Sequence, residues 1–241
     1  MQKSTFLDLL FPRSCLYCKT LLPTSEPNTY LCSSCRGFIP WNTVSRCAFC
    51  PRAVTLWKTC EKCRPDHSLD RLLVATDYRD PVVERMVKAL KYRFVQVVAS
   101  DIGAIMATYF EQRASLIGLD PKNLTISSVP LHPRRLRWRG FNQAKLIANA
   151  IGKELGLSVR HDLLKRTVYK SPQADIEDRV ERIKNAENIF AVGPLVAVRP
   201  LTRTVLLVDD VATTASTLNN AARVLKDAGA KNVIGFVFAR G

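Results

Sequence analysis

Residues 204–217, TVLLVDDVATTAST, join an apolar run to two acids and a turn of small and hydroxyl-bearing residues. Residues 205–208 show no polar alternation, which predicts a strand buried on both faces of a parallel sheet. Asp209 and Asp210 then fall at the carboxyl end of that strand. Apolar residues recur at helical spacing from Ser216 until Gly229, so residues 212–217 are predicted to form a turn that leads into a helix.

This turn has the chemistry of a phosphate site, because a helix N-terminus presents unpaired backbone N–H groups and the positive end of the helix dipole. Four side chains add hydroxyl donors: Thr213, Thr214, Ser216 and Thr217. The carboxylates of Asp209 and Asp210 can accept hydrogen bonds from the vicinal hydroxyls of a sugar. The stretch therefore fits a ribose 5-phosphate. The alternative is a strand whose terminal acids only cap the next helix.

The stretch resembles the phosphoribosyl-diphosphate (PRPP) signature of type I phosphoribosyltransferases, and the whole chain resembles the ComF family. The resemblance implies that Asp209 and Asp210 hold the ribose hydroxyls while residues 213–217 surround the 5-phosphate. In that family the position of Ala215 is usually glycine. An alanine methyl is expected to crowd the turn if the position needs a positive φ or close backbone approach, so the sequence favours binding over turnover.

Charge and composition narrow the class of protein. The 241 residues suffice for one sizeable core and a smaller module, and 47% hydrophobic content is ordinary for a globular protein. The formal net charge of +15 implies attraction to phosphates, on a small ligand or on a polynucleotide, unless the basic surface is merely solvated. No run of apolar residues is long enough to cross a membrane, so we expect a soluble, cytoplasmic protein without membrane insertion.

All eight cysteines stand in four Cys-x-x-Cys pairs near the N-terminus: Cys15 and Cys18, Cys32 and Cys35, Cys47 and Cys50, Cys60 and Cys63. Such pairs place two thiolates on one tetrahedral Zn²⁺, so four pairs predict two zinc ions. A disulfide framework is the alternative, but the expected compartment is reducing. Sequential pairing gives two successive zinc ribbons, and a crossed arrangement stays open. His67 follows the last pair and is not predicted as a ligand.

The cysteine-rich module has a structural and a binding interpretation. So few apolar residues bury little surface, and metal binding is expected to supply much of the folding free energy. The alternative is a surface that stacks on single-stranded bases, because cations and rings interleave along it. These residues are Arg36, Trp41, Arg46, Phe49, Arg52, Trp57 and Lys58. The structural interpretation is favoured.

A second basic stretch, residues 130–143 or PLHPRRLRWRGFNQ, lies between a predicted strand at 124–129 and a predicted helix from 142 to 155. This order places an arginine-rich loop at the mouth of the sheet, where ligands bind in α/β folds. The loop resembles the pyrophosphate loop of some phosphoribosyltransferases. The resemblance implies that Gly140 lets the backbone approach the diphosphate and that Arg139 supplies a planar donor fork. His132 is interpreted as a packed loop residue.

The remaining segments complete an α/β pattern. We predict a strand at 72–78, a helix that begins at Pro81 after an Asp80 N-cap, a helix at about 95–117 and a strand near 158–164. Strands at 188–192, 205–208 and 232–238 are predicted to complete the sheet. A polar stretch, 165–173, matches the position of the mobile loop of phosphoribosyltransferases, and four residues match the ComF spacing: Gln173, Arg182, Asn185 and Phe190.

The predicted architecture is a double zinc ribbon at residues 1–68 and a mainly parallel α/β domain of type I phosphoribosyltransferase (Rossmann-like) topology at 69–241. Two functions follow from the resemblance. One is transfer of ribose 5-phosphate from PRPP to a nitrogen nucleophile, with Mg²⁺ offsetting the diphosphate charge. The other is single-stranded DNA handling in DNA uptake and natural transformation, with competence-machinery proteins as partners. The acceptor base and the oligomeric state cannot be predicted from the sequence.

Overall fold

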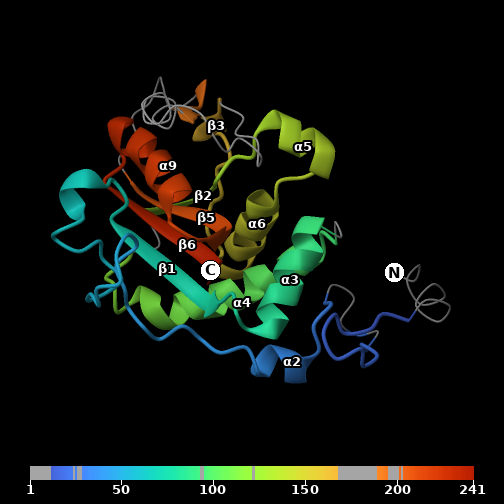
Figure 1. Cartoon of the computed structure of the whole chain (residues 1–241). Coiled ribbons are helices and arrows are strands. Elements are labelled where there is room, and N and C mark those ends of the chain that lie inside the picture. The colour runs from blue at the N-terminus through green and yellow to red at the C-terminus, as the bar shows by residue number, and fades with distance from the viewer. Residues whose placement is uncertain are drawn as a thin grey trace, which may run out of the picture.

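A computed structural model of the chain describes residues 12–23, 25, 29–92, 95–120, 123–167, 189–194, 201 and 203–241. The central element is a sheet of four parallel strands in the order β1-β6-β5-β2 (Figure 1). Its strands are β1 (Arg71–Asp77), β2 (Leu124–Ser128), β5 (Thr204–Ala212) and β6 (Asn232–Arg240). The mainly parallel α/β fold is therefore as predicted.

Strand β5 lies inside the sheet, between β6 and β2, and side chains on both of its faces are buried. Leu206 and Val208 join the core beneath α3 (Pro81–Tyr92), α4 (Val98–Ala114) and α6 (Gln143–Leu155). Val205 and Leu207 join a second core beneath α9 (Ser216–Asp227). The uninterrupted apolar run thus reflects burial between two helical layers, with α9 on one face and α4 on the other (Figure 1).

A small antiparallel sheet of β3 (Leu164–Arg166) and β4 (Phe190–Val192) packs beside α9. The sequence prediction placed residues 188–192 in the main sheet, and this was wrong, because β4 pairs only with β3 among the described residues. The predicted strand near 158–164 reduces to one parallel bridge between Val159 and Ile126, followed by β3. Gln173, Arg182 and Asn185 lie outside the described residues, whereas Phe190 is buried in β4.

The arginine-rich stretch is a helix rather than the predicted loop. Residues Pro133–Arg139 form α5, with proline in its first turn and Gly140 at its C-cap. His132 supplies the N-cap, because its Nδ1 atom accepts a hydrogen bond of 3.2 Å from the backbone N–H of Arg134. His132 therefore caps a helix. This agrees with the sequence analysis in giving it a structural role, although the residue stands at the start of a helix and not within a loop.

The N-terminal module docks on the free edge of the sheet. The backbone N–H of Leu72 on β1 donates to the carbonyl oxygen of Trp57 at 3.1 Å, and Thr59 donates to Asp70 at 2.8 Å. Farther along β1, the N–H of Asn42 donates to the carbonyl oxygen of Ala75. These bonds cover an edge that would otherwise offer unpaired backbone groups. The short helices α2 (Ser33–Gly37) and η1 (Arg64–Asp66) belong to this module.

Candidate functional site

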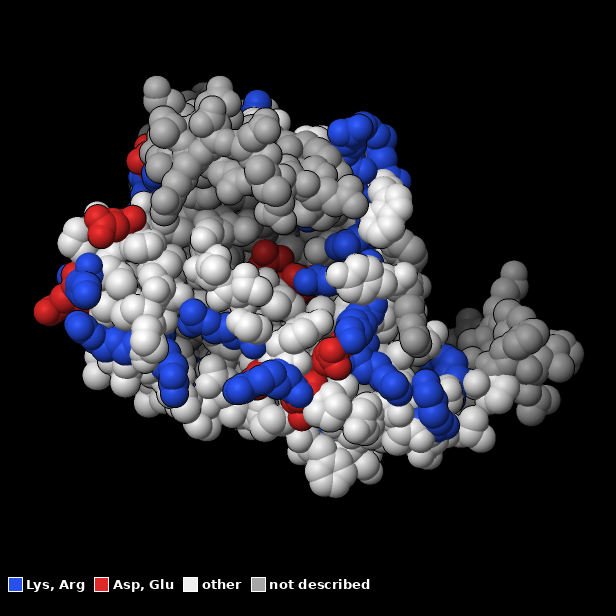
Figure 2. All heavy atoms as spheres, in the orientation of Figure 1, with Lys and Arg blue, Asp and Glu red and all other residues white. Residues whose placement is uncertain are grey.

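The two acids of β5 lie near the carboxyl end of the strand. The strand continues to Ala212 and so extends past the predicted end at 208. Oδ1 of Asp209 accepts a hydrogen bond of 2.9 Å from the backbone N–H of Asp210. Oδ1 of Asp210 accepts one of 2.7 Å from the backbone N–H of Val211. One oxygen of each carboxylate is thereby fixed, while the other remains for further partners. Figure 2 shows acidic atoms recessed at the centre of this face, with basic side chains beside them.

Asp210 is 3% exposed, and its Oδ2 atom lies 3.3 Å from Nζ of Lys91 on α3. Asp209 is half-buried, and burial together with the neighbouring charge of Asp210 raises its pKa to about 7. Two carboxylates in adjacent positions disfavour simultaneous ionisation, and a cation nearby relieves this repulsion. Lys91 supplies that charge from another element. The sequence analysis gave Lys91 no role at this site.

The turn after β5 is shaped by an alanine in the left-handed region. Ala215 has φ 57° and ψ 8°, is almost fully buried and stands at the N-cap position of α9, where it provides no side-chain cap. The hydroxyls of Thr214 and Ser216 lie 2.8 Å apart. A cavity of about 50 Å³ is bounded by Asp209 and by the residues of this turn. Helix geometry gives the first backbone N–H groups of α9 no partner within the helix, and that of Ser216 makes only a long hydrogen bond of 3.5 Å to Oγ1 of Thr214.

Arg139, the last residue of α5, is half-buried close to the acids. Burial lowers the pKa of its guanidinium, and the charge of Asp210 opposes that shift. Its Nε atom is buried and makes no hydrogen bond within the described residues. Gly140 has φ 79°, a conformation that a side chain disfavours, although a Cβ atom there would meet nothing within 4 Å. Glycine is thus needed here for its backbone conformation.

Arg166 is a second cation of this site. The sequence analysis placed it in the polar stretch 165–173, expected to be a mobile loop, whereas residues 165 and 166 belong to strand β3 and residues 168–173 lie outside the described residues. Burial and the charge of Arg135 lower the pKa of Arg166, while the charge of Asp209 opposes that shift. Its Nε atom is likewise buried without a hydrogen bond among the described residues. Its guanidinium carbon lies 5.5 Å from the ring centroid of Phe190 on β4. The small antiparallel sheet thus brings a cation close to the acids, which a sequence pattern cannot reveal.

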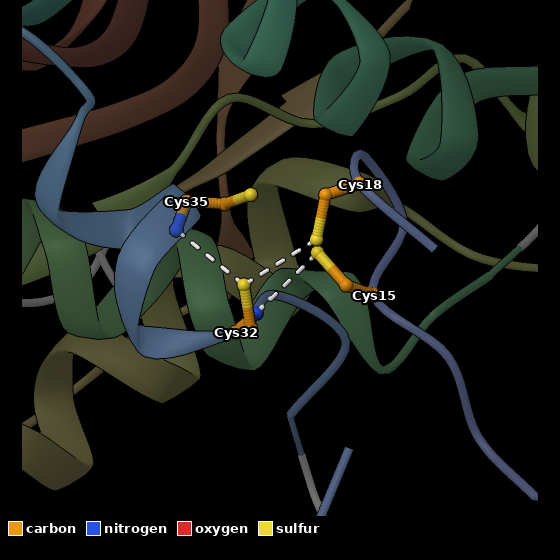
Figure 3. Close-up of side chains that lie close together, drawn as sticks. All are labelled: Cys15, Cys18, Cys32 and Cys35. Atoms are coloured by element: carbon orange, nitrogen blue, oxygen red, sulfur yellow. Dashed lines mark hydrogen bonds between the residues drawn. The ribbon is translucent and has the colours of Figure 1, made fainter. Parts of the chain in front are cut away.

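The cysteines form two groups of four in sequential order, so the crossed pairing is ruled out. The first group is Cys15, Cys18, Cys32 and Cys35, whose Sγ atoms all lie within 4.8 Å of one another and point to a common centre (Figure 3). The second is Cys47, Cys50, Cys60 and Cys63, with the same spread. All eight are free thiols. His67 belongs to neither group, because its ring stacks on Phe49 with a centroid separation of 3.6 Å.

The sulfur atoms of each group of four cysteines are spaced as the ligands of a tetrahedral metal ion would be. Sγ of Cys18 and Sγ of Cys32 lie 3.6 Å apart, and those of Cys50 and Cys60 lie 3.7 Å apart. A tetrahedron with Zn–S bonds of about 2.3 Å has edges of about 3.8 Å. Backbone N–H groups of Cys32 and Cys35 point at sulfurs of Cys15 and Cys32, at 3.5 and 3.4 Å. Burial and the adjacent thiols raise the pKa of Cys35 to about 12, as expected where several thiolates need a cation to coexist.

A buried carboxylate joins the segment that carries the first group of four cysteines to the α/β core. Asp101 on α4 is 3% exposed and accepts hydrogen bonds from Thr29 Oγ1 at 2.6 Å and from the backbone N–H of Tyr30 at 2.7 Å. Nη2 of Arg36 lies 3.0 Å from the same carboxylate. Arg36, which the sequence suggested as part of a base-stacking surface, is therefore engaged in an intramolecular ion pair.

Comparison with known families matches both parts of the chain. The double zinc ribbon domain matches residues 6–64, and the phosphoribosyl transferase domain matches residues 146–241. The chain is 25% identical to Competence protein F of Haemophilus influenzae, over 91% of this chain and 93% of the relative. It is 28% identical to the DNA utilization protein YhgH of Escherichia coli, over 84% and 93% of the two chains. With Competence protein ComFC of Bacillus subtilis the identity is 27%, over 89% and 86%.

The fold, the thiol groups and the two domain matches define a double zinc ribbon protein with a phosphoribosyltransferase domain. The sequence similarity to the relatives extends over most of this chain. In sequence and domain content the chain is thus similar to these competence and DNA utilization proteins over most of its length. No helix in the described part of the chain has the length and apolar character needed to span a membrane.

Proposed function

We propose that the protein binds PRPP, with Mg²⁺, at the carboxyl end of β5. The carboxylates of Asp209 and Asp210 accept hydrogen bonds from the ribose hydroxyls, and residues 213–217 receive the 5-phosphate. The observation that carries the proposal is the proximity of this acid pair and its adjoining turn to two half-buried guanidinium groups, Arg139 and Arg166. Their unpaired Nε atoms are suitable donors for a diphosphate.

The electrostatics suit a ligand of mixed charge distribution. The sugar end of PRPP carries hydroxyl donors, which favour carboxylates, whereas both phosphate ends favour cations and helix N-termini. Lys91 and Arg139 lie on the Asp210 side of the pair, and the charge of Arg166 acts on Asp209. Mg²⁺ would neutralise part of the diphosphate charge. Each protein group therefore faces the part of PRPP whose charge it complements.

Calorimetric titration of the zinc-loaded protein with PRPP and Mg²⁺ tests this proposal. Replacing both Asp209 and Asp210 by Asn removes two charged acceptors, each worth about 1.5–3 kcal/mol, and PRPP affinity is expected to fall at least roughly tenfold. Asp227→Asn, at the exposed end of α9, is the matched control and should bind normally. Undetectable PRPP binding, or equal binding by the double variant, contradicts the proposal. Pyrophosphate release in the presence of candidate bases tests for transferase turnover in the same samples.

Single-stranded DNA binding is a second candidate function, supported by the surface of α5. Trp138 is 66% exposed, and Arg134 and Arg137 beside it are exposed as well. An exposed ring among arginines combines base stacking with phosphate attraction. The names of the relatives, competence and DNA utilization proteins, agree with such a role. Because two of these relatives are named competence proteins, we propose proteins of the competence machinery as partners.

We also propose that each group of four cysteines holds one zinc ion. We further propose that the protein works in the cytoplasm. Eight free thiols arranged for metal binding persist in a reducing compartment. The zinc ions would then be structural, because each group supplies four thiol ligands and leaves no position for a substrate. The domain limits of 1–68 and 69–241 remain a prediction.

A further inference from the structure

A large cavity in the described part of the chain lies outside the ribose site, between the second group of four cysteines and the sheet. Its volume is about 1120 Å³, above the roughly 300–1,000 Å³ typical of small-molecule pockets. One wall is formed by β1 and the end of β6, and the opposite wall by the segment from Pro40 to Pro51 together with Trp57. We call it the ribbon–sheet cavity. Its size suits a chain segment better than a single small molecule.

The walls of the ribbon–sheet cavity are held rigidly. The guanidinium of Arg240, at the end of β6, donates to the carbonyl oxygens of Cys47 and Ala48 at 3.3 and 2.8 Å. Trp41 lies against Tyr109 with ring centroids 5.9 Å apart, and the ring of Phe49 is stacked on His67. The cavity is thus bounded by contacts within the fold, and the half-buried rings of Trp41 and Phe49 each pack against a neighbouring ring.

The lining has the chemistry of a site for single-stranded nucleic acid. The half-buried rings of Trp41 and Phe49 offer surfaces on which bases of any sequence can stack. Arg46 is exposed at the same wall and can meet a backbone phosphate, while Arg79 is neutralised by Asp77 at 2.6 Å. The cavity therefore combines stacking surfaces with positive charge, which are the two elements of sequence-tolerant binding.

The ribbon–sheet cavity adjoins the phosphate turn, because Thr213 and Thr214 line both it and the small cavity beside Asp209. A 5′-phosphate in this turn has its ribose on the side of the acids. If that phosphate is a diester, its remaining bridging oxygen leads to the preceding nucleotide, and the ribbon–sheet cavity is the space next to the turn. In a DNA strand, only the nucleotide at the 3′ end has a free 3′-hydroxyl to offer to Asp209 and Asp210.

From this polarity we propose that the protein binds the 3′-hydroxyl end of a single strand. The terminal nucleotide occupies the ribose phosphate site, and the preceding nucleotides occupy the ribbon–sheet cavity. The inference rests on the proposed function, because it uses the same acids and the same turn. It follows that a 3′ end and PRPP exclude each other, and that a terminal ribonucleotide, with two hydroxyls for two carboxylates, binds more tightly than a terminal deoxynucleotide.

The test is a PRPP titration of the zinc-loaded full chain, with Mg²⁺, in the presence of competing oligothymidylates of roughly eight nucleotides, within the usual site size. The strands differ only at the 3′ end, which is a deoxyribose hydroxyl, a ribose diol or a phosphate. We expect the hydroxyl-ended strands to displace PRPP, the diol most strongly, and the phosphate-ended strand to fail. A 5′-phosphate should make no difference to any of them.

Two variants separate the ribbon–sheet cavity from the ribose site. Arg46→Glu is expected to weaken displacement by the strands about threefold to tenfold, because it reverses a charge that meets phosphate, and to leave PRPP affinity unchanged. Phe49→Leu keeps apolar bulk but removes a stacking ring, and should act in the same direction. Arg52→Glu is the matched control, since Arg52 is exposed on the same module but does not line the cavity.

The outcomes distinguish the two proposals. If PRPP itself does not bind, the proposed function fails and this inference falls with it. If PRPP binds and no strand displaces it, or if the phosphate-ended strand displaces it equally, only the 3′-end inference is overturned. Equal loss of strand binding in Arg46→Glu and Arg52→Glu would also overturn it, because binding would then follow overall charge rather than the cavity.

Discussion

Nζ of Lys91 on α3 lies 3.3 Å from Oδ2 of Asp210 on β5, and this ion pair joins the helical layer to the acid pair. The side chain of Lys91 is 22% exposed and that of Asp210 only 4%, so the carboxylate has little access to water. Lysine supplies a compact charge on a flexible stem and can move toward a bound phosphate without leaving the site. The pair therefore stabilises the ligand-free acids and keeps a cation close to where a diphosphate would bind.

Lys91→Met keeps the apolar stem and leaves the Asp210 carboxylate buried without its cation. We expect the free energy of unfolding, from urea denaturation of the zinc-loaded protein, to fall by about 1–3 kcal/mol. Lys88→Met is the control, because Lys88 on the same helix pairs with Glu84 at the surface, where an ion pair contributes little. Adding Asp210→Asn to Lys91→Met should recover part of the loss. Equal stability of the Lys91 and Lys88 variants would mean that the buried ion pair contributes no more to the free energy of unfolding than the surface pair.

Zinc content and its removal test the N-terminal module. Elemental analysis of protein purified under reducing conditions should find two zinc ions per chain, and Cys15→Ser or Cys47→Ser should each reduce this to one. Chelation should abolish hydrogen-exchange protection in the module. Protection of Leu72 on β1 should fall too, because its N–H donates to Trp57 of the module. Protein without zinc, or protection unchanged by chelation, would refute the zinc ribbon interpretation.

The pH dependence of stability tests the environment of Asp209. Its pKa in the folded protein is about 7, against an ordinary value of 3.8, so the folded state holds this proton more tightly than the unfolded state. The stabilising contribution is complete below about pH 4, declines as the pH rises toward 7 and is constant above it. Asp209→Asn removes this titration. The melting temperature of the variant relative to the starting protein should therefore rise between pH 5 and about pH 7.5.

Asp162→Asn is the control for this pH series. The hydrogen bonds of Arg160 lower the pKa of Asp162, so that carboxyl is ionised throughout the range and its replacement should give a difference independent of pH. The same flat difference for Asp209→Asn would show that Asp209 has an ordinary pKa, and that Lys91 or solvent compensates its burial.

The sequence revealed what is local or periodic in this protein. The apolar run of β5, the helix after Ser216 and the paired cysteines all have patterns of their own, and each was confirmed. Lys91 and Arg166 were given no role at the site, because only the packing of α3 and β3 against the end of β5 brings them near the acids. The α5 helix was read as a loop because its arginines mask any apolar periodicity.

Salt dependence tests the α5 surface as a site for single-stranded DNA. Replacing Arg134, Arg135 and Arg137 by Glu should weaken binding to every sequence alike, because their contacts are to phosphate, and should reduce the slope of log K against log salt by about 2. A triple replacement by Glu of Lys145, Lys153 and Lys231 changes the net charge equally and is the control. Affinity that is constant from low to moderate salt would contradict an electrostatic mode and direct attention to the rings of the ribbon–sheet cavity.

Ala215→Gly tests the backbone of the phosphate turn. Ala215 has φ 57°, so glycine would relieve a left-handed conformation that costs an alanine about 1–2 kcal/mol. The same change removes a buried methyl worth about 0.8 kcal/mol and loosens the unfolded chain by about 0.4–1 kcal/mol. These effects nearly cancel, so we expect little change in stability. PRPP affinity should be equal or higher, because the turn can approach the phosphate without the methyl.

Ala222→Gly, in the middle of α9, provides the contrast, since Ala222 is buried in a regular helix where glycine relieves nothing. That variant should lose about 1 kcal/mol or more of stability. Calorimetry with PRPP and Mg²⁺ on the starting protein and both variants separates the cases. PRPP binding that appears only in Ala215→Gly would identify a site that has lost its ligand through this one position and would leave DNA handling as the function. Weaker binding by Ala215→Gly than by the starting protein would show that the methyl supports the turn, against the expectation drawn from its φ angle.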